Sequence, residues 1–170
     1  MNKPNVTLSL AITALLIALV FIGTFAIQIP MPFSQGGLIH AGDLVFFTVC
    51  LLFSPRRSAI AGAFGMGLFD LLSPYAIWAP FTFVIRLIMG FVISTVAGKS
   101  GKVSRYLLAL IVGLPILLGG YYLAEAILYG NWVSPVRSIP GNLGQWLIGA
   151  AGAIPLSRIL YSIPSLKNMR

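Results

Sequence analysis

Acidic residues, cysteine and histidine are almost absent from this sequence. Its 170 residues include three acidic side chains, one Cys and one His, and only 8% of them are charged. A soluble domain averages about 25% charged residues, which keep its surface solvated. Because so few charged side chains could not cover a water-exposed surface, the composition excludes an ordinary soluble domain.

The scarcity of reactive residues also excludes several kinds of site. A single Cys50 cannot form an intramolecular disulfide or a Cys-rich metal site. His40 is the one histidine, so a Cys/His metal cluster is not expected. Gly98-Lys-Ser100 resembles the end of a phosphate-binding loop, but Ile93 stands where that motif needs glycine. We therefore expect no metal, cofactor or ATP site in this chain.

Long apolar runs are what the sequence has instead. Hydrophobic residues make up 58% of the chain, and its mean hydropathy is +0.97. A spanning helix needs about 20 apolar residues, whereas a run of 10–14 can be re-entrant. The pattern predicts an all-α membrane protein, one domain over residues 1–170, with six transmembrane helices at residues 6–27, 41–53, 58–72, 81–97, 106–129 and 143–163.

The positive charges indicate how these helices are oriented. With the N-terminus in the cytoplasm and alternating sides, the inner segments hold Lys3, Arg56, Arg57, Lys99, Lys102, Arg105, Lys167 and Arg170. The outer loops hold only Arg137. If the short second run were re-entrant, Arg56 and Arg57 would lie outside. The positive-inside rule therefore favours six spans with both termini in the cytoplasm of a cell membrane. Because these charges lie in short breaks between apolar runs, they do not indicate nucleic-acid binding.

Ionisable residues within or beside the apolar runs are candidates for a site. Each costs roughly 2.5–3.5 kcal/mol at the bilayer centre, so such residues are usually functional. Asp70, Arg86 and Glu125 lie towards the outer ends of their runs, and His40 and Asp43 stand at the outer start of the second. We expect all five to converge on the outer third of the membrane. A purely structural alternative pairs Arg86 with Glu125 or Asp70 and uses Asp43 as a helix cap.

The outer side also gathers aromatic and amide side chains, including all three tryptophans. An interfacial aromatic belt explains part of this, but a belt should appear on both faces. An apolar pocket with a few polar groups suits a small planar solute. The substrate-binding candidates are Gln35, His40, Asp70, Trp78, Arg86, Tyr122, Glu125, Trp132, Asn142 and Trp146.

Several motifs resemble one transporter family. They are Gly36-Gly-Leu-Ile-His-Ala-Gly-Asp43, Gly67-Leu-Phe-Asp-Leu-Leu-Ser73, Trp78-Ala-Pro-Phe81 and Ile85-Arg-Leu-Ile-Met-Gly90. Together with six helices in 170 residues, they resemble the S components of energy-coupling factor (ECF) transporters. The subgroup is the one assigned to hydroxymethylpyrimidine, pyridoxine or related vitamin precursors. One departure is Arg86, where related sequences favour Lys.

The resemblance implies a function and partners. Such a chain captures a vitamin at the outer face of a prokaryotic cell membrane. It then associates with a membrane coupling (T) subunit and two cytoplasmic ATPases, and is not itself an enzyme. Ala14 and Ala18 match an Ala-x-x-x-Ala motif that docks on the coupling subunit, although such spacing also serves ordinary helix packing. The rings of Trp78, Tyr122, Trp132 and Trp146 would stack on the vitamin, while His40, Asp70, Arg86, Glu125 and Asn142 would bind its polar groups.

Other readings remain open. The ligand could be riboflavin, pantothenate or thiamin. A small intramembrane hydrolase could use Asp43 and Asp70 as an acid/base pair, although no nucleophile motif accompanies them. A purely structural membrane subunit would leave the outer polar cluster without a role.

Overall fold

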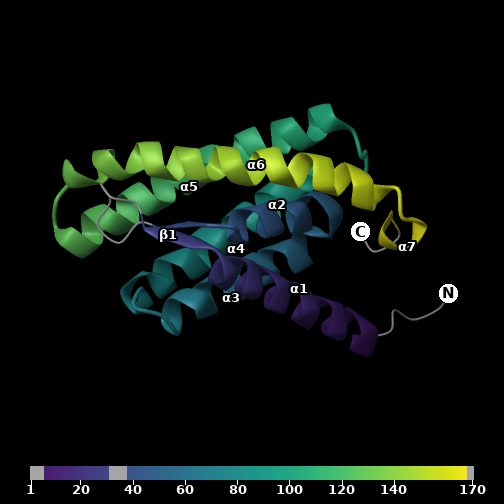
Figure 1. The fold of residues 1–170 in the computed structure, drawn as a ribbon, viewed down its shortest axis with the longest axis horizontal. Helices are drawn as coiled ribbons and strands as arrows, with labels where there is room; N and C mark the ends of the chain where they lie inside the picture. Colours follow the sequence, from purple (N-terminus) through teal and green to yellow (C-terminus); the bar gives the residue numbers. More distant parts are fainter. Residues whose placement is uncertain (1–5, 31–37, 168–170) are drawn as a thin grey trace.

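The described residues form a bundle of six main helices (Figure 1). The computed structural model describes residues 6–30 and 38–167. The main helices are α1 (Val6–Ala26), α2 (Gly42–Leu52), α3 (Pro55–Leu71), α4 (Ala79–Ala97), α5 (Val103–Tyr129) and α6 (Ile139–Tyr161). Shorter turns are η1 (Ala76–Trp78), η2 (Ser134–Ser138) and α7 (Pro164–Lys167). Each helix expected from an apolar run is present, so the mostly helical fold is confirmed.

Some helices begin earlier than their apolar runs. Helix α3 begins at Pro55, three residues before the expected start, with Ser54 in an extended conformation ahead of it. Proline suits the first helical turn, where no N–H partner is needed. Arg56 and Arg57 therefore belong to the helix rather than to the preceding loop, because a helix can carry charge in its first turn.

The segment expected as an irregular loop after α1 contains a short hairpin. Strand β1 (Gln28–Pro30) pairs antiparallel with β2 (Leu38–His40), with Gln28 opposite His40. Three residues per strand are too few to show an alternating pattern in the sequence. The predicted site residue Gln35 lies between the strands, outside the described residues.

Among the described residues, four segments are long and apolar enough to cross a membrane. These are α1, η1 with α4, α5, and η2 with α6. At 1.5 Å per residue, α2 is about 17 Å long and α3 about 25 Å, against a hydrocarbon core of about 30 Å. The prediction of six helices is confirmed. Helices α2 and α3, however, are shorter than the hydrocarbon core is thick, so their length does not show that they span it.

Helix α2 lies at the centre of the bundle (Figure 1). It packs against α6, α1, α4 and α3, and Phe46, Phe47, Cys50 and Leu51 on it are fully buried. Cys50 is therefore a small residue of the hydrophobic core. Because α2 is short and starts inside the bundle, its N-terminal end leaves room for side chains from the surrounding helices to enclose a space.

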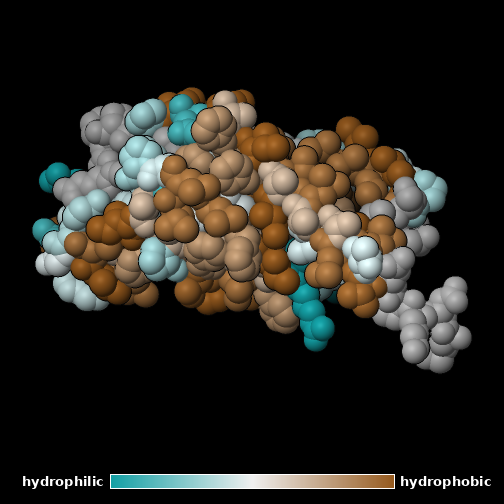
Figure 2. All heavy atoms as spheres, turned by 90° about the horizontal axis from the view of Figure 1, so that it is seen from below, coloured by the Kyte–Doolittle hydropathy of each residue, from teal (hydrophilic) through white to brown (hydrophobic). Residues whose placement is uncertain are grey.

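The outside of the bundle is hydrophobic. Figure 2 shows apolar residues over most of one face, with polar residues gathered towards one end. Exposed apolar side chains occur on every long helix, for example Leu10, Phe25, Val84, Ile111 and Ile148. Such a surface matches hydrocarbon rather than water. It supports the prediction of a membrane protein.

The end of α6 is tied to the loop between α4 and α5. Arg158 donates a hydrogen bond to the carbonyl of Gly101 at 2.6 Å, and the Tyr161 hydroxyl donates to the carbonyl of Lys99 at 2.6 Å. This loop carries Lys99 and Lys102, with Arg105 in the first turn of α5, and it lies at the opposite end of α4 from η1. The two ends of the bundle therefore differ in charge.

Candidate ligand-binding pocket

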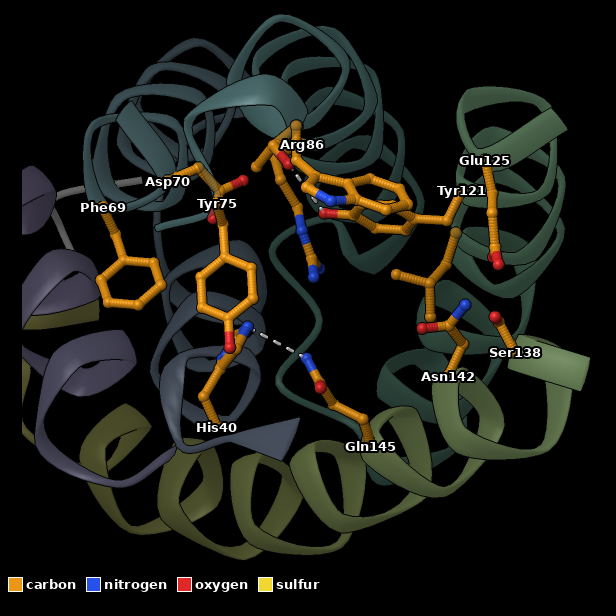
Figure 3. Close-up of a pocket in the computed structure, with 13 residues that line it drawn as sticks. His40, Phe69, Asp70, Tyr75, Arg86, Tyr121, Glu125, Ser138, Asn142 and Gln145 are labelled. Atoms are coloured by element: carbon orange, nitrogen blue, oxygen red, sulfur yellow. Dashed lines mark hydrogen bonds between the residues drawn. The ribbon is translucent and has the colours of Figure 1, made fainter. Parts of the chain in front are cut away.

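A pocket opens at the hairpin end of the bundle (Figure 3). Its empty volume is about 620 Å³ with the open mouth included. Residues from α3 to α6 and from the hairpin line it. They are His40, Phe69, Asp70, Tyr75, Trp78, Thr82, Arg86, Leu117, Tyr121, Glu125, Ser138, Asn142 and Gln145.

An ion pair between α4 and α2 supports this pocket. Arg86 Nη1 lies 2.6 Å from Asp43 Oδ1, and the two side chains are 2% and 0% exposed. The Arg86 guanidinium also lies 5.5 Å from the ring centres of both Phe46 and Tyr121, where ring faces attract a cation. These contacts hold Arg86 in one place and offset its charge.

This pairing corrects the structural alternative drawn from the sequence. That alternative paired Arg86 with Glu125 or Asp70, and it used Asp43 as a helix cap. No side-chain cap hydrogen bond forms at the start of α2. Helix α2 packs directly against α4, so the carboxylate one residue inside its start meets the guanidinium. The hydrolase reading loses support as well, because Asp43 is held by Arg86 and does not line the pocket.

Gln145 and His40 extend the network from Asp43 to the pocket. The Gln145 amide nitrogen donates to Asp43 Oδ2 at 2.9 Å and lies 3.2 Å from His40 Nε2. His40 Nδ1 lies 3.1 Å from the Gly42 N–H. Burial of its ring lowers the pKa of His40 to about 4, against the opposing influence of Asp43. The imidazole is therefore neutral at physiological pH, and it connects the hairpin to α6 without adding charge.

Aromatic rings form one wall of the pocket. The rings of Phe69 and Tyr75 stack with their centres 6.5 Å apart, and those of Trp78 and Tyr121 also lie 6.5 Å apart. The Tyr121 hydroxyl lies 3.3 Å from Thr82 Oγ1. This wall offers ring faces for a flat ligand together with hydroxyl groups for its edge.

Glu125 of α5 lies one helical turn from Tyr121, on the side of the pocket across from Phe69 and Tyr75 (Figure 3). Its side chain is only 2% exposed, and it points towards Ser138 and Asn142 of the next segment (Figure 3). Within the described part of the chain, no hydrogen bond or ion pair of its carboxylate is found. Leaving a buried polar group without a hydrogen-bond partner costs free energy. The Glu125 carboxylate is therefore available to accept a hydrogen bond from a bound molecule.

The structure gathers most of the predicted site residues but not all of them. His40, Asp70, Trp78, Arg86, Glu125 and Asn142 line the pocket. Trp146 is packed in the hydrophobic core. Trp132 is 60% exposed, and its carbonyl accepts a hydrogen bond of 2.5 Å from the Tyr122 hydroxyl. Neither Trp132 nor Tyr122 lines the pocket, so their assignment as ligand contacts stays a prediction.

Several pocket residues that were not predicted lie one helical turn from residues that were. Tyr121 stands four residues before Glu125, and Thr82 four before Arg86. Side chains four apart share a helix face, so this spacing selects Tyr121 rather than Tyr122. The other added residues are Phe69, Tyr75, Leu117, Ser138 and Gln145.

Comparisons with known proteins agree with this architecture. Residues 5–162 match the family model described as ECF-type riboflavin transporter, S component. The chain is 28% identical to the thiamine precursor transporter HmpT of Lactococcus lactis subsp. cremoris, over all of this chain and 97% of that protein. It is 33% identical over 111 residues to an uncharacterized protein in the gap 3′ region of Pyrococcus woesei, covering 65% of this chain and 74% of that one. The chain therefore belongs to the ECF-type riboflavin transporter S-component family.

Proposed function

We propose that this chain is the substrate-binding S component of an ECF transporter for a small heteroaromatic vitamin precursor, with hydroxymethylpyrimidine or pyridoxine as the preferred class. The observation that carries the proposal is the pocket itself, because it combines an aromatic wall with buried polar groups inside an apolar bundle. A planar ring with polar substituents fits both parts. The match along the whole chain to a thiamine precursor transporter supports the same class.

Riboflavin is the second candidate, because the matching family model bears its name. It is a three-ring compound with a long polyol chain, whereas hydroxymethylpyrimidine and pyridoxine each have one ring. One titration series can therefore separate the two candidates.

Ligand binding to the purified protein in detergent tests the proposal, with tryptophan fluorescence as the readout. We expect saturable quenching by a one-ring vitamin precursor and a weaker response to riboflavin, thiamin and pantothenate. Trp78 lines the pocket and Trp132 does not. A Trp78→Ala substitution should therefore weaken binding at least about tenfold, as loss of an aromatic contact of 1.5 kcal/mol would, while Trp132→Ala leaves the affinity unchanged. Preferred binding of riboflavin would replace the first candidate by the second. No response to any of these vitamins would remove the proposal.

We also propose that the pocket faces the outside and that both termini lie in the cytoplasm. The segment from Lys99 to Arg105 supports this orientation, since it carries three basic residues at the end of the bundle away from the pocket. Uptake is then driven by two cytoplasmic ATPases through a membrane coupling subunit. Helix α1 is a suitable docking surface, because Ala14 and Ala18 are exposed on the side of α1 away from the bundle core.

Bulky substitutions on α1 test the docking surface. Replacing Ala14 and Ala18 by leucine should abolish or strongly reduce recovery of the coupling subunit and ATPases with the tagged chain, because close approach of helices in lipid needs small residues. Ligand affinity should stay unchanged, since neither residue lines the pocket. The matched control is Ala151→Leu on the exposed side of α6, which should leave assembly intact. Normal assembly of the α1 variant would place the docking surface elsewhere.

A further inference from the structure

The charges around the pocket do not balance. Arg86 is the only cation among the described lining residues, and it is already paired with Asp43 beneath them. His40 is neutral at physiological pH, since burial lowers its pKa to about 4. Asp70 and Glu125 remain as two further acidic side chains on the lining. The described lining of the pocket therefore carries more acidic than basic side chains.

Glu125 is the more informative of the two acids. Asp70 is partly exposed and lies close to Thr82 and Arg86. Neighbouring side chains of the protein therefore already interact with its carboxyl group. Glu125 is nearly fully buried, and its carboxyl group points into the cavity between α5 and the start of α6 (Figure 3). Leaving such a group unpaired costs free energy, so the missing partner is best supplied by the ligand.

We infer that Glu125 recognises an amino group beside a ring nitrogen on the ligand, so that the pocket prefers an aminopyrimidine to pyridoxine and rejects anionic solutes. The inference rests on the proposed function and names the substrate class of the same pocket. The aromatic side chains of the pocket hold the ring plane, and the Glu125 carboxyl group binds one edge of that ring.

The chemistry of this pairing is specific. An amino group donates one hydrogen bond to a carboxyl oxygen, and the adjacent ring nitrogen shares one proton with the other oxygen. Both hydrogen bonds form whichever partner carries that proton, so the pair stays neutral overall and is bidentate. Pyridoxine has no amino group beside its ring nitrogen. The 4-oxo analogue has no amino donor, and its ring nitrogen is not basic enough to take the shared proton, so it cannot form the charge-assisted pair with the carboxylate.

The same charge balance acts against anions. A phosphorylated precursor or pantothenate would bring negative charge next to Asp70 and Glu125 in a setting shielded from water. Like charges in a low dielectric repel strongly. Arg86 offsets only part of this added charge, because its guanidinium already shares its charge with Asp43 at 2.6 Å.

Isothermal titration with matched ligands tests the inference on the full-length chain. The probes are 4-amino-5-hydroxymethyl-2-methylpyrimidine, its 4-oxo analogue, its phosphate ester, pyridoxine and pantothenate. We expect the amino compound to bind at least about 100-fold more tightly than the oxo analogue, because a site built for a donor rejects an analogue that lacks it. The phosphate ester and pantothenate should show no binding at concentrations that saturate with the amino compound.

A Glu125→Gln substitution provides the second measurement. A glutamine amide can rotate to present a donor and an acceptor to either pyrimidine, so the preference for the amino compound should fall to within about tenfold. The control is Leu123→Ala, two residues away on the exposed side of α5, which should keep the full preference. An unchanged preference in Glu125→Gln, or equal binding of both pyrimidines by the wild type, would overturn the inference. Tight binding of pantothenate or the phosphate ester would overturn its exclusion of anions. Failure of every one-ring heterocycle to bind would instead overturn the proposed function.

Discussion

Replacing Arg86 with methionine is expected to lower the free energy of unfolding by about 3–5 kcal/mol, which is the usual cost of breaking a buried ion pair from one side. Asp43 is fully buried, and its Oδ1 has Arg86 Nη1 at 2.6 Å. Without the guanidinium, the carboxylate keeps the Gln145 amide but loses its counter-charge. Denaturant unfolding in detergent, followed by circular dichroism, measures the effect.

The double variant Asp43→Asn with Arg86→Met separates the lost counter-charge from lost packing. It removes both charges and retains a side chain that can accept from Gln145. Stability should return to within about 1–2 kcal/mol of the wild type, because replacing both partners of a buried pair is often neutral. If the double variant is as unstable as Arg86→Met, the ion pair is not the cause. The aromatic contacts of Arg86 with Phe46 and Tyr121 would then be responsible.

A Gly90→Leu substitution is expected to destabilise the bundle by about 3 kcal/mol or more and to weaken ligand binding. A Cβ atom at Gly90 would lie 2.6 Å from the carbonyl oxygen of Ser58 and 2.8 Å from Cα of Ala59. These are backbone atoms of α3, so a side chain at Gly90 can be accommodated only if the two helices separate. Overpacking of this kind costs about 1–3 kcal/mol even where side chains can move.

The effect on binding follows from the position of the two helices. Helices α3 and α4 pack together more extensively than any other pair, and each contributes to the pocket, with Asp70 on one and Arg86 on the other. The matched control is Gly119→Leu on α5, because nothing lies within 4 Å of a Cβ at that position. That variant should bind normally and should be as stable as the wild type or slightly more so, since leucine favours a helix over glycine. Equal losses in both variants would show that the close packing at Gly90 is not responsible.

The helices were predictable because their signal is local. An apolar run of about 20 residues must bury its backbone polar groups in hydrogen bonds of its own when it enters lipid, so the run itself specifies a helix. The breaks at Pro55 and Gly98-Lys-Ser-Gly101 were equally visible. The hairpin of Gln28–Pro30 with Leu38–His40 was not, since its pairing depends on residues about ten positions apart.

The pocket was predictable in outline. His40, Asp70, Arg86 and Glu125 came from the argument that ionisable side chains are costly near an apolar run, and Trp78 and Asn142 came from the gathering of aromatic and amide side chains on the outer side. Two predicted residues do not line the pocket of the structure. Tyr122 and Trp146 were chosen by residue type, whereas the i, i+4 spacing from Glu125 points to Tyr121, and Trp146 is packed in the core. Whether a side chain reaches the pocket depends more on the helix face that it occupies than on its residue type.

The class of the molecule follows from the sequence alone: a helical membrane protein with its polar groups collected at one end. Composition and hydropathy decide this, because the bilayer acts on each segment separately. The partners of the buried charges were decided only by the tertiary structure. Arg86 could have met any of three carboxylates, and the packing of the short helix α2 against α4 selected Asp43. That choice also left Glu125 unpaired at the pocket, because one buried cation can neutralise only one of the acids around it.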